Sequence, residues 1–290
     1  MNSINEPSTL KIACLTTIAL CTFAANSVLC RLALESQLID PASYTSIRLM
    51  SGAIALLILV YMGAGNLNTK KGSWSGGVTL FIYACTLSYG YISLDTATGA
   101  LILFGAVQLT IMCVSIVKGE KIFVGEWLGI IIAFCGFVYL VYPLMSQPSF
   151  IGAILMAISG ITWGLYTLIG KGSDRPLVDT CYNFVRTLPF VVVLFLFTFE
   201  QIEVTNQGIL LAIISGVVTS GIGYAIWYQV LPYLATTQAA VLQLTVPVIA
   251  AIGGVFIVAE SLTIRLILSS ILVLGGIGLV IFAKDKQPSK

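Results

Sequence analysis

The stretch SIRLMSGAIALLILVYMG, residues 46–63, places Arg48 at the head of an apolar run that is long enough to cross most of a lipid bilayer. A guanidinium near hydrocarbon costs at least about 2.5 kcal/mol on insertion scales, and it is rarely left without a partner. Arg48 therefore has a functional or an architectural role. Its partner is the first question that the sequence raises.

Apolar runs of this kind recur along the whole chain. Hydrophobic residues make up 58% of the 290 residues and charged residues 9%, against about 25% charged in an average soluble domain. Strands of a membrane barrel would alternate polar and apolar residues, whereas ILVLGGIGLVIF is apolar on every side. We therefore predict an all-α polytopic membrane protein of ten transmembrane helices. The expected spans are residues 10–33, 41–62, 76–94, 97–117, 124–143, 149–171, 179–199, 207–230, 233–258 and 263–283.

The first run also has features of a secretory signal, because Lys11 precedes it and the small residues Ala24 and Ala25 lie near its end. Its place in the repeat described below favours a permanent span. The seven cysteines are scattered through apolar runs without a CxxC pair, so we expect buried hydrophobic side chains rather than disulfides or metal ligands. We expect no metal and no cofactor.

Basic residues are distributed unevenly between the two expected sides of the membrane. With ten spans and an internal amino terminus, Arg31 and Arg265 are the basic residues of the external segments. The excess of internal Lys and Arg satisfies the positive-inside rule, which predicts that both termini are cytoplasmic. We expect the protein in the inner membrane. The internal basic residues are Lys11, Lys70, Lys71, Lys118, Lys121, Lys171, Arg175, Lys284, Lys286 and Lys290.

The two halves of the chain share one pattern. At an offset of 140 residues, Arg31 aligns with Lys171 and Glu120 aligns with Glu260, while Arg48 meets Arg186 at an offset of 138. Each half, residues 1–147 and 148–290, would contain five spans, so the second half enters the membrane from the opposite side. Such inverted repeats are typical of secondary transporters.

These patterns resemble the drug/metabolite transporter superfamily, specifically its ten-helix EamA-type permeases. The resemblance covers nearly the whole chain and rests on motifs that occur in the same order in both halves. They are Phe23, Ala24 and Arg31 against Trp163, Gly164 and Lys171, the arginines Arg48 and Arg186, the glutamates of VKGEKI and VAESLT, and the glycine-rich closing helices. Phe23-Ala24 departs from the tryptophan-glycine pair that is common in this family.

The resemblance implies a basket of helices in which the first, third, fourth, sixth, eighth and ninth surround a central cavity. Polar and aromatic residues that share one face of these helices are candidates for binding substrate. Packing between helices, or an interfacial aromatic belt for Tyr91, Trp227 and Tyr228, is the alternative. The candidates are Phe23, Asn26, Tyr83, Gln108, Trp163, Tyr166, Tyr224, Gln238 and Thr245.

Structural and gating roles are expected at two further groups of residues. We expect Arg48 and Arg186 to extend toward the membrane faces and bond to helix-end carbonyls, with a substrate carboxylate as the alternative partner. Glu120 and Glu260 would be solvated or would cap the helix that follows each of them. Gating would involve small or helix-breaking residues, with tight packing as the alternative: Gly90, Gly99, Gly105, Gly221, Gly223 and Pro247.

The sequence favours a carrier over an enzyme. It contains no histidine, no HExxH motif and no paired carboxylates within a span, so neither a catalytic set nor strong proton coupling is expected. We predict export or exchange of small organic metabolites, above all amino acids with bulky or aromatic side chains, by alternating access. A nucleotide-sugar or drug-like substrate and a non-transporting scaffold or sensor are the alternatives. The expected partners are the substrate and the lipid bilayer, without nucleic acid, and a monomer is compatible with the sequence.

Overall fold

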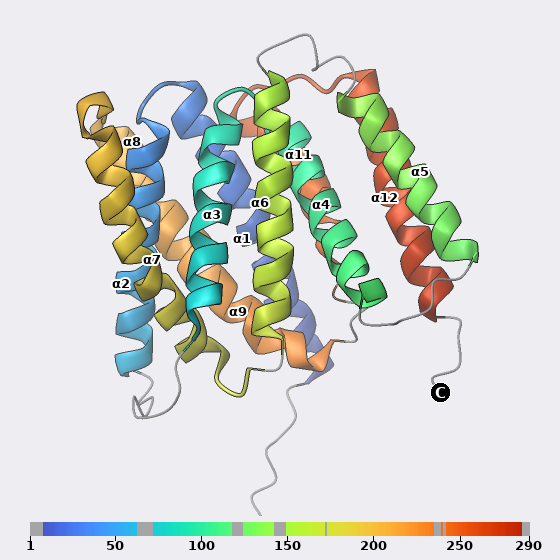
Figure 1. Ribbon diagram of the computed structural model, residues 1–290, viewed down its shortest axis with the longest axis horizontal. Coiled ribbons are helices and arrows are strands. Elements are labelled where there is room, and N and C mark those ends of the chain that lie inside the picture. Colours follow the sequence, from blue (N-terminus) through green and yellow to red (C-terminus); the bar gives the residue numbers. More distant parts are fainter. Residues whose placement is uncertain are drawn as a thin grey trace, which may run out of the picture.

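The computed structural model describes residues 8–62, 72–117, 124–141, 149–171, 173–234, 239 and 242–285. These residues form a bundle of helices (Figure 1), and an isolated bridge between Ile39 and Val204 is the one β-type contact among them. The predicted all-α class is confirmed. The helices are α1 (Thr9–Glu35), α2 (Pro41–Met62), α3 (Trp74–Tyr91), α4 (Thr96–Val117), α5 (Val124–Val141), α6 (Ser149–Gly170), α7 (Pro176–Thr198), η2 (Phe199–Gln201), α8 (Asn206–Ile214), η3 (Ser215–Ile222), α9 (Gly223–Val230), η4 (Leu231–Tyr233), α11 (Val246–Ile257) and α12 (Ile264–Asp285).

Helix length and composition agree with a protein that crosses a membrane several times. In the described part of the chain, 6 helices are long and apolar enough to span a bilayer. Three further apolar helices, Val124–Leu140, Val246–Ile257 and Ile264–Val280, are shorter. These helices support the polytopic class that the sequence predicts, whereas the number of ten spans stays a prediction.

Side-chain caps explain where several helices begin. The hydroxyls of Ser73 and Thr205 accept bonds from the backbone N–H groups of Gly76 and Gly208, at 2.9 and 3.1 Å. Such caps satisfy backbone donors that have no partner within the helix. The expected spans 76–94 and 207–230 accordingly begin within a few residues of α3 and α8.

The ninth span differs from its prediction. A single helix is expected over 233–258, but Leu234 has an extended backbone. Residues 239, 242 and 243 are helical, residues 244 and 245 form a turn, and α11 begins at Val246. Pro247 lies in the first turn of α11, where its missing N–H breaks no bond inside the helix. The expected single helix is therefore interrupted, and Pro247 lies just after the turn at residues 244 and 245.

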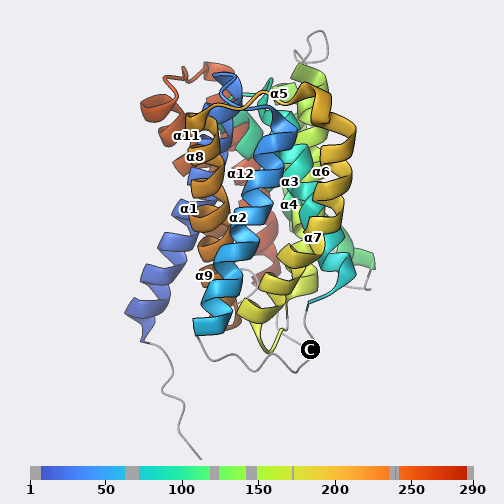
Figure 2. The same cartoon turned by 90° about the vertical axis from the view of Figure 1, so that its left-hand side faces the viewer.

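The bundle is built from helix pairs that join the two halves of the chain (Figure 2). α1 packs against α9, η3 and α11, and α6 packs against α3 and α4. α2 packs against α7 and η3, while α4 packs against α11. α5 and α12 form a close pair at one edge of the bundle (Figure 1).

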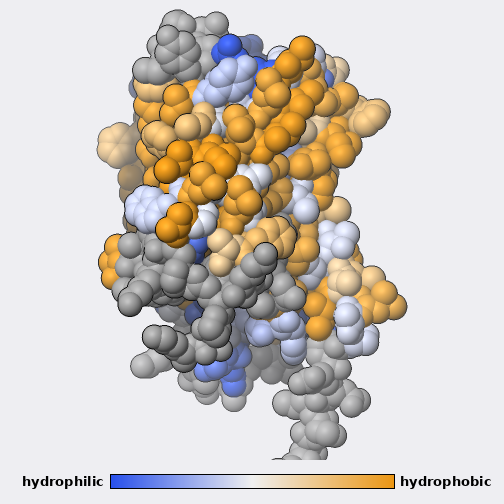
Figure 3. Space-filling model, turned by 90° about the vertical axis from the view of Figure 1, so that its right-hand side faces the viewer, coloured by the Kyte–Doolittle hydropathy of each residue, from blue (hydrophilic) through white to orange (hydrophobic). Residues whose placement is uncertain are grey.

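The surface beside this edge is strongly apolar (Figure 3). Large hydrophobic side chains of α5 and α12 are exposed there, as expected for helices that contact lipid rather than water. They include Trp127, Leu128, Ile131, Phe134, Ile267, Leu268, Ile271 and Phe282.

Glycines allow α5 and α12 to approach closely. A Cβ atom added at Gly276 would lie 2.5 Å from the backbone nitrogen of Ala133 and 2.6 Å from the carbonyl oxygen of Gly129. A Cβ atom added at Gly278, two residues further along α12, would meet nothing within 4 Å. Only the first position is therefore restricted by the facing backbone.

We predict that Gly276→Ala destabilises the protein and that Gly278→Ala does not. Overpacking costs about 1–3 kcal/mol, while both variants share the higher helix propensity of alanine. Thermal unfolding of the purified protein in detergent would measure the difference. Equal melting temperatures for the two variants would contradict the close contact between α5 and α12.

Candidate functional site

Arg48 lies at the centre of the bundle, among hydroxyl groups from three other elements. Its side chain is almost fully buried, at 1% exposure. Nε donates to Ser220 Oγ at 3.0 Å, and Nη2 donates to the hydroxyls of Tyr83 and Tyr224 at 3.3 and 3.1 Å. The guanidinium also lies over the ring of Tyr83, 5.3 Å from its centroid. Arg48 thus does not extend to a helix end, and that expectation is wrong.

Asn26 completes this polar cluster from α1. Its Nδ2 donates to the Tyr83 hydroxyl at 3.3 Å, and the Tyr224 hydroxyl donates to the same Tyr83 oxygen at 3.1 Å. Its Oδ1 accepts bonds from Ser215 and Thr219, at 2.8 and 3.1 Å. Both ends of the amide therefore have partners, as a buried amide requires.

The π-helix η3 supplies the hydroxyl groups of this cluster. Ser215, Thr219 and Ser220 all belong to it, and all three are buried. Single-turn π-helices are often found at functional sites, since the wider winding presents side chains that a regular helix would not bring together. With the ordinary helical period Ser215 and Thr219 share a face but Ser220 does not, so the pattern does not single out the three residues as one group.

Aromatic rings pack against the polar cluster. The ring of Trp163 lies 4.8 Å from that of Tyr83 and 4.7 Å from that of Tyr224, between centroids. Phe23 contacts Trp163 edge-on at 5.8 Å. These side chains surround a small cavity of about 10 Å³, which is close to the space needed for one water molecule. The cavity is lined by Phe23, Asn26, Ser27, Tyr83, Leu103, Phe104, Trp163 and Tyr224.

Charged groups close the bundle at one end, called the Arg31 face below and defined by Arg31 and Glu260. Arg31 Nε lies 3.3 Å from Glu260 Oε1, and both side chains are mostly buried. Arg31 Nη1 also donates to the carbonyls of Tyr91 and Ile92, at 3.0 and 3.1 Å. The end of α1 is thereby tied both to the end of α3 and to the segment that follows α11.

Glu260 also caps a helix, although not the one that the sequence indicates. Its carboxylate accepts bonds from the backbone N–H and the hydroxyl of Thr96, the first residue of α4, at 2.9 and 3.0 Å. Ala259, immediately before it, has a φ of 61°, and this turn folds Glu260 back toward α4. The expectation of a cap on the following helix, α12, is wrong, because Arg31 and Thr96 hold the carboxylate elsewhere.

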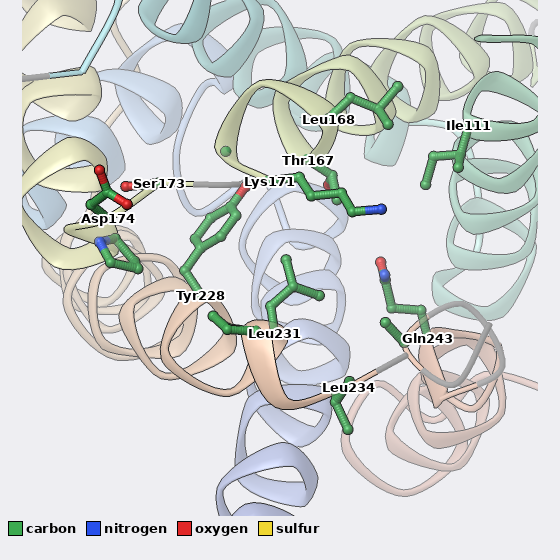
Figure 4. Close-up of a pocket in the computed structure, with 14 residues that line it drawn as sticks. Ile111, Thr167, Leu168, Lys171, Ser173, Asp174, Tyr228, Leu231, Leu234 and Gln243 are labelled. Atoms are coloured by element: carbon green, nitrogen blue, oxygen red, sulfur yellow. The ribbon is translucent and has the colours of Figure 1, made fainter. Parts of the chain in front are cut away.

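A larger pocket opens at the other end of the bundle, called the Lys171 face. Its volume is about 390 Å³, and it lies between the ends of α6 and α9 and the segment before α11 (Figure 4). Lys171 and Gln243 point toward each other across it. Tyr228 lines the pocket and contacts Tyr166 at 5.9 Å between ring centroids, and Tyr166 in turn contacts Trp163 at 5.5 Å. Buried rings therefore separate the pocket from the central cavity.

The structure brings together most of the candidates for the central cavity. Phe23, Asn26, Tyr83, Trp163 and Tyr224 line it together. Tyr166 is buried one ring further toward the Lys171 face, and Gln108 is buried in α4 without lining the cavity.

Of the two remaining candidates, the structure describes only Thr245. Thr245 is exposed in the turn before α11, where its hydroxyl donates to the carbonyl of Leu242 at 2.7 Å, so the interpretation of this side chain as part of the cavity is wrong. Gln238 and Glu120 lie outside the described residues.

The candidate gating glycines lie at contacts between helices. Gly90 faces Met156 of α6, Gly99 faces Tyr91, and Gly223 faces Thr22 of α1. Gly221 lies closest to Gly216 within η3 and to Gly52 of α2, while Gly105 is buried in the middle of α4.

The two arginines that the repeat pairs occupy different surroundings. Arg186 donates to the carbonyl of Tyr182 in its own helix at 3.1 Å and lies over Trp74, 5.8 Å from the ring centroid. This agrees with an architectural position between α3 and α7. The expected interfacial belt is wrong for Tyr91, Trp227 and Tyr228, since all three side chains are buried in the bundle.

Comparison with known proteins agrees with these observations. A profile of the EamA-like transporter family matches residues 150–282. The uncharacterized protein PA1977 of Pseudomonas aeruginosa is 43% identical over 267 residues, which cover 92% of this chain and 93% of that protein. The chain belongs to the EamA-like transporter family. The expected membership of the drug/metabolite transporter superfamily is thereby confirmed.

Other relatives are more distant. The uncharacterized transporter YoaV of Bacillus subtilis is 21% identical, over 86% of this chain and 90% of that protein. An uncharacterized transporter of Archaeoglobus fulgidus is 25% identical, over 84% of this chain and 89% of that protein. A protein crystal structure with 15% identity shares the fold, with a TM-score of 0.67 over 95% of this chain and 99% of the other. The chain is thus a multi-pass membrane transporter and not an enzyme, as the sequence predicts.

We predict that Glu260→Gln lowers stability more than Asp95→Asn. Both carboxylates approach Arg31, but Glu260 is 10% exposed and Asp95 is 61% exposed, at 3.6 Å. Loss of a charged partner in a buried hydrogen bond costs about 1.5–3 kcal/mol, whereas an exposed pair contributes about 1 kcal/mol or less. Melting temperatures in detergent would reveal the difference, and equal shifts would show that Glu260 does not hold the Arg31 face closed.

Proposed function

We propose that this EamA-like transporter is a secondary carrier that exports or exchanges small organic metabolites by alternating access, with amino acids as the first class to test. It would lie in the inner membrane with both termini in the cytoplasm. The Arg31 face would then be external and the Lys171 face internal. Transport would use ten helices in two inverted repeats, residues 1–147 and 148–290.

The pattern of helix contacts supports the inverted repeat. Exchanging each helix for its counterpart 140 residues away turns the contacts of α1 with α9 and α11 into those of α6 with α3 and α4. The same exchange turns the contact of α2 with η3 into that of α7 with α3. The pairs α2 with α7, α4 with α11 and α5 with α12 are each converted into themselves. Two equivalent halves would allow one site to open to either side.

One observation carries the proposal. A buried cluster of polar and aromatic side chains from both halves lies between a face closed by Arg31 and Glu260 and a face with a pocket of about 390 Å³. A carrier requires a central site with access from only one side at a time. A scaffold or sensor has no need of such an arrangement.

The lining of the centre favours a compact organic solute. The rings of Phe23, Trp163 and Tyr224 provide apolar surface, and the hydroxyls provide hydrogen bonds, a combination that suits ligands with an apolar body and a polar end. A nucleotide-sugar would require several cationic groups for its phosphates. The residues that line the central cavity include no lysine or arginine.

Counterflow in proteoliposomes tests the proposed function. Liposomes preloaded with an unlabelled amino acid should accumulate the same labelled amino acid when they contain the protein and not when they lack it. We expect Trp163→Ala to reduce the rate by about tenfold, because ring contacts of about 1–1.5 kcal/mol correspond to one order of magnitude. Trp74→Ala, which removes a tryptophan that is 60% exposed, is the matched control. If no member of an amino-acid and small-metabolite panel is transported, the proposed function is wrong.

We further predict that joining Thr96 to Glu260 stops transport reversibly. In a background without native cysteines, Thr96→Cys and Glu260→Cys would be linked with a short, reducible bifunctional thiol reagent, since the two native side chains are hydrogen-bonded at 3.0 Å. Counterflow should fall to background and recover after reduction, because the Arg31 face could not open. Each single-cysteine variant with the same reagent is the control. Undiminished transport by the linked protein would mean that this face need not open.

A further inference from the structure

The polar cluster around Arg48 contains more hydrogen-bond donors than acceptors. The Tyr83 oxygen already accepts from Asn26, Arg48 and Tyr224. Arg48 Nη1 is buried and has no hydrogen-bond partner among the described residues. A guanidinium has five N–H donors and no acceptor, so the bonds to Ser220 and the tyrosines leave part of it unsatisfied.

The charge of Arg48 also lacks an opposite charge. No carboxylate of the described residues lies within ion-pair distance of it, whereas Arg31 has three such partners, Glu35, Asp95 and Glu260. Bonds to neutral hydroxyls and the contact with the Tyr83 ring reduce the cost of burying the guanidinium, but they do not neutralise it. One water molecule in the small cavity could accept a hydrogen bond but would bring no negative charge.

The polar cluster around Arg48 adjoins the central cavity, where a ligand would bind. Arg48 bonds directly to Tyr83 and Tyr224, and both of these residues line the central cavity. The cavity also receives the amide of Asn26, whose oxygen is already occupied by Ser215 and Thr219. What the cluster offers to a ligand is therefore mainly N–H and O–H groups. A negatively charged acceptor would bond to the free N–H groups of Arg48 and would also neutralise its charge.

We propose that the central site recognises a carboxylate on the transported molecule, and that Arg48 is its counter-ion, acting together with Tyr83 and Tyr224. This inference rests on the proposed function and specifies its substrate class. The rings of Phe23 and Trp163 hold the apolar part of the molecule. Because no acidic residue lines the cavity, an ammonium group on the substrate contributes less to binding than the carboxylate. The cavity must enlarge as the substrate enters from the pocket at the Lys171 face.

A set of four matched compounds tests the proposal by thermal unfolding of the purified protein. L-phenylalanine and 3-phenylpropanoate carry the carboxylate, whereas L-phenylalaninamide and 2-phenylethylamine lack it. We expect the two carboxylates to raise the melting temperature and to bind about tenfold or more tightly than the two compounds without one, as expected for loss of a hydrogen-bonded charge. Stronger or equal binding of the amide and the amine would overturn the proposal while leaving a carrier of other solutes intact.

Variants of Arg48 test its part directly. In Arg48→Gln the preference for L-phenylalanine over its amide should disappear, while Arg186→Gln, the repeat counterpart on α7, should keep it. Arg48→Lys keeps the charge and should retain part of the preference, which covers the case in which the glutamine variant does not fold. An undiminished preference in either Arg48 variant would overturn the role of Arg48.

Two further measurements distinguish a carboxylate site from a chloride site, and ligand binding from transport. Replacing chloride by the larger anion isethionate should leave the preference for carboxylates unchanged. If chloride alone stabilises the protein through Arg48 and no carboxylate does, the cluster is a site for a small inorganic anion and the proposal is wrong. If counterflow fails for every compound while 3-phenylpropanoate still binds through Arg48, the anion site stands and the proposed transport does not.

Discussion

A buried guanidinium without a carboxylate partner among the described residues is the constraint on which the centre of this protein depends. Arg48 reaches from α2 to hydroxyl groups on α3, η3 and α9, and so connects elements of both halves of the chain. The cost of keeping this charge away from water is offset only if its neighbours are held in position. The surrounding tyrosines, the π-helix and Asn26 can be understood as the groups that hold it.

Different kinds of side chain make the contacts at the two ends of the bundle. At the Arg31 face, the ion pair with Glu260 draws the ends of α1 and α3 and the start of α4 together. At the Lys171 face, aromatic rings such as Tyr228 and Tyr166 separate the pocket from the centre. The Arg31–Glu260 contact requires oppositely charged partners, whereas Tyr166 and Tyr228 make an edge-to-face contact between uncharged rings. The two faces are therefore chemically unlike, although the repeat that builds them is shared.

The sequence predicts the helical class, the family and the core of the site because these follow from apolar runs and from motifs that are repeated in both halves. Apolar runs indicate spans, and the family resemblance implies that the helices carrying Phe23, Asn26, Tyr83, Trp163 and Tyr224 surround a cavity. The turn at residues 244 and 245 was not predictable, since Pro247 suits the first turn of a helix as well as a break within one. Long side chains caused the errors at Arg48 and Glu260. A guanidinium can extend in several directions, and only the positions of Ser220, Tyr83 and Tyr224 determine which one Arg48 takes.

The way in which Asn26 is held has a consequence for ions. Its oxygen is occupied by Ser215 and Thr219, and the Tyr83 oxygen already receives three donors, so few lone pairs remain free around the cavity. Sodium and potassium are bound by oxygen lone pairs, and the nearby positive charge of Arg48 repels them as well. An alkali cation would therefore find few ligands and an unfavourable potential at the centre. A sodium gradient, if it drives this transporter, is expected to act through a site elsewhere in the molecule.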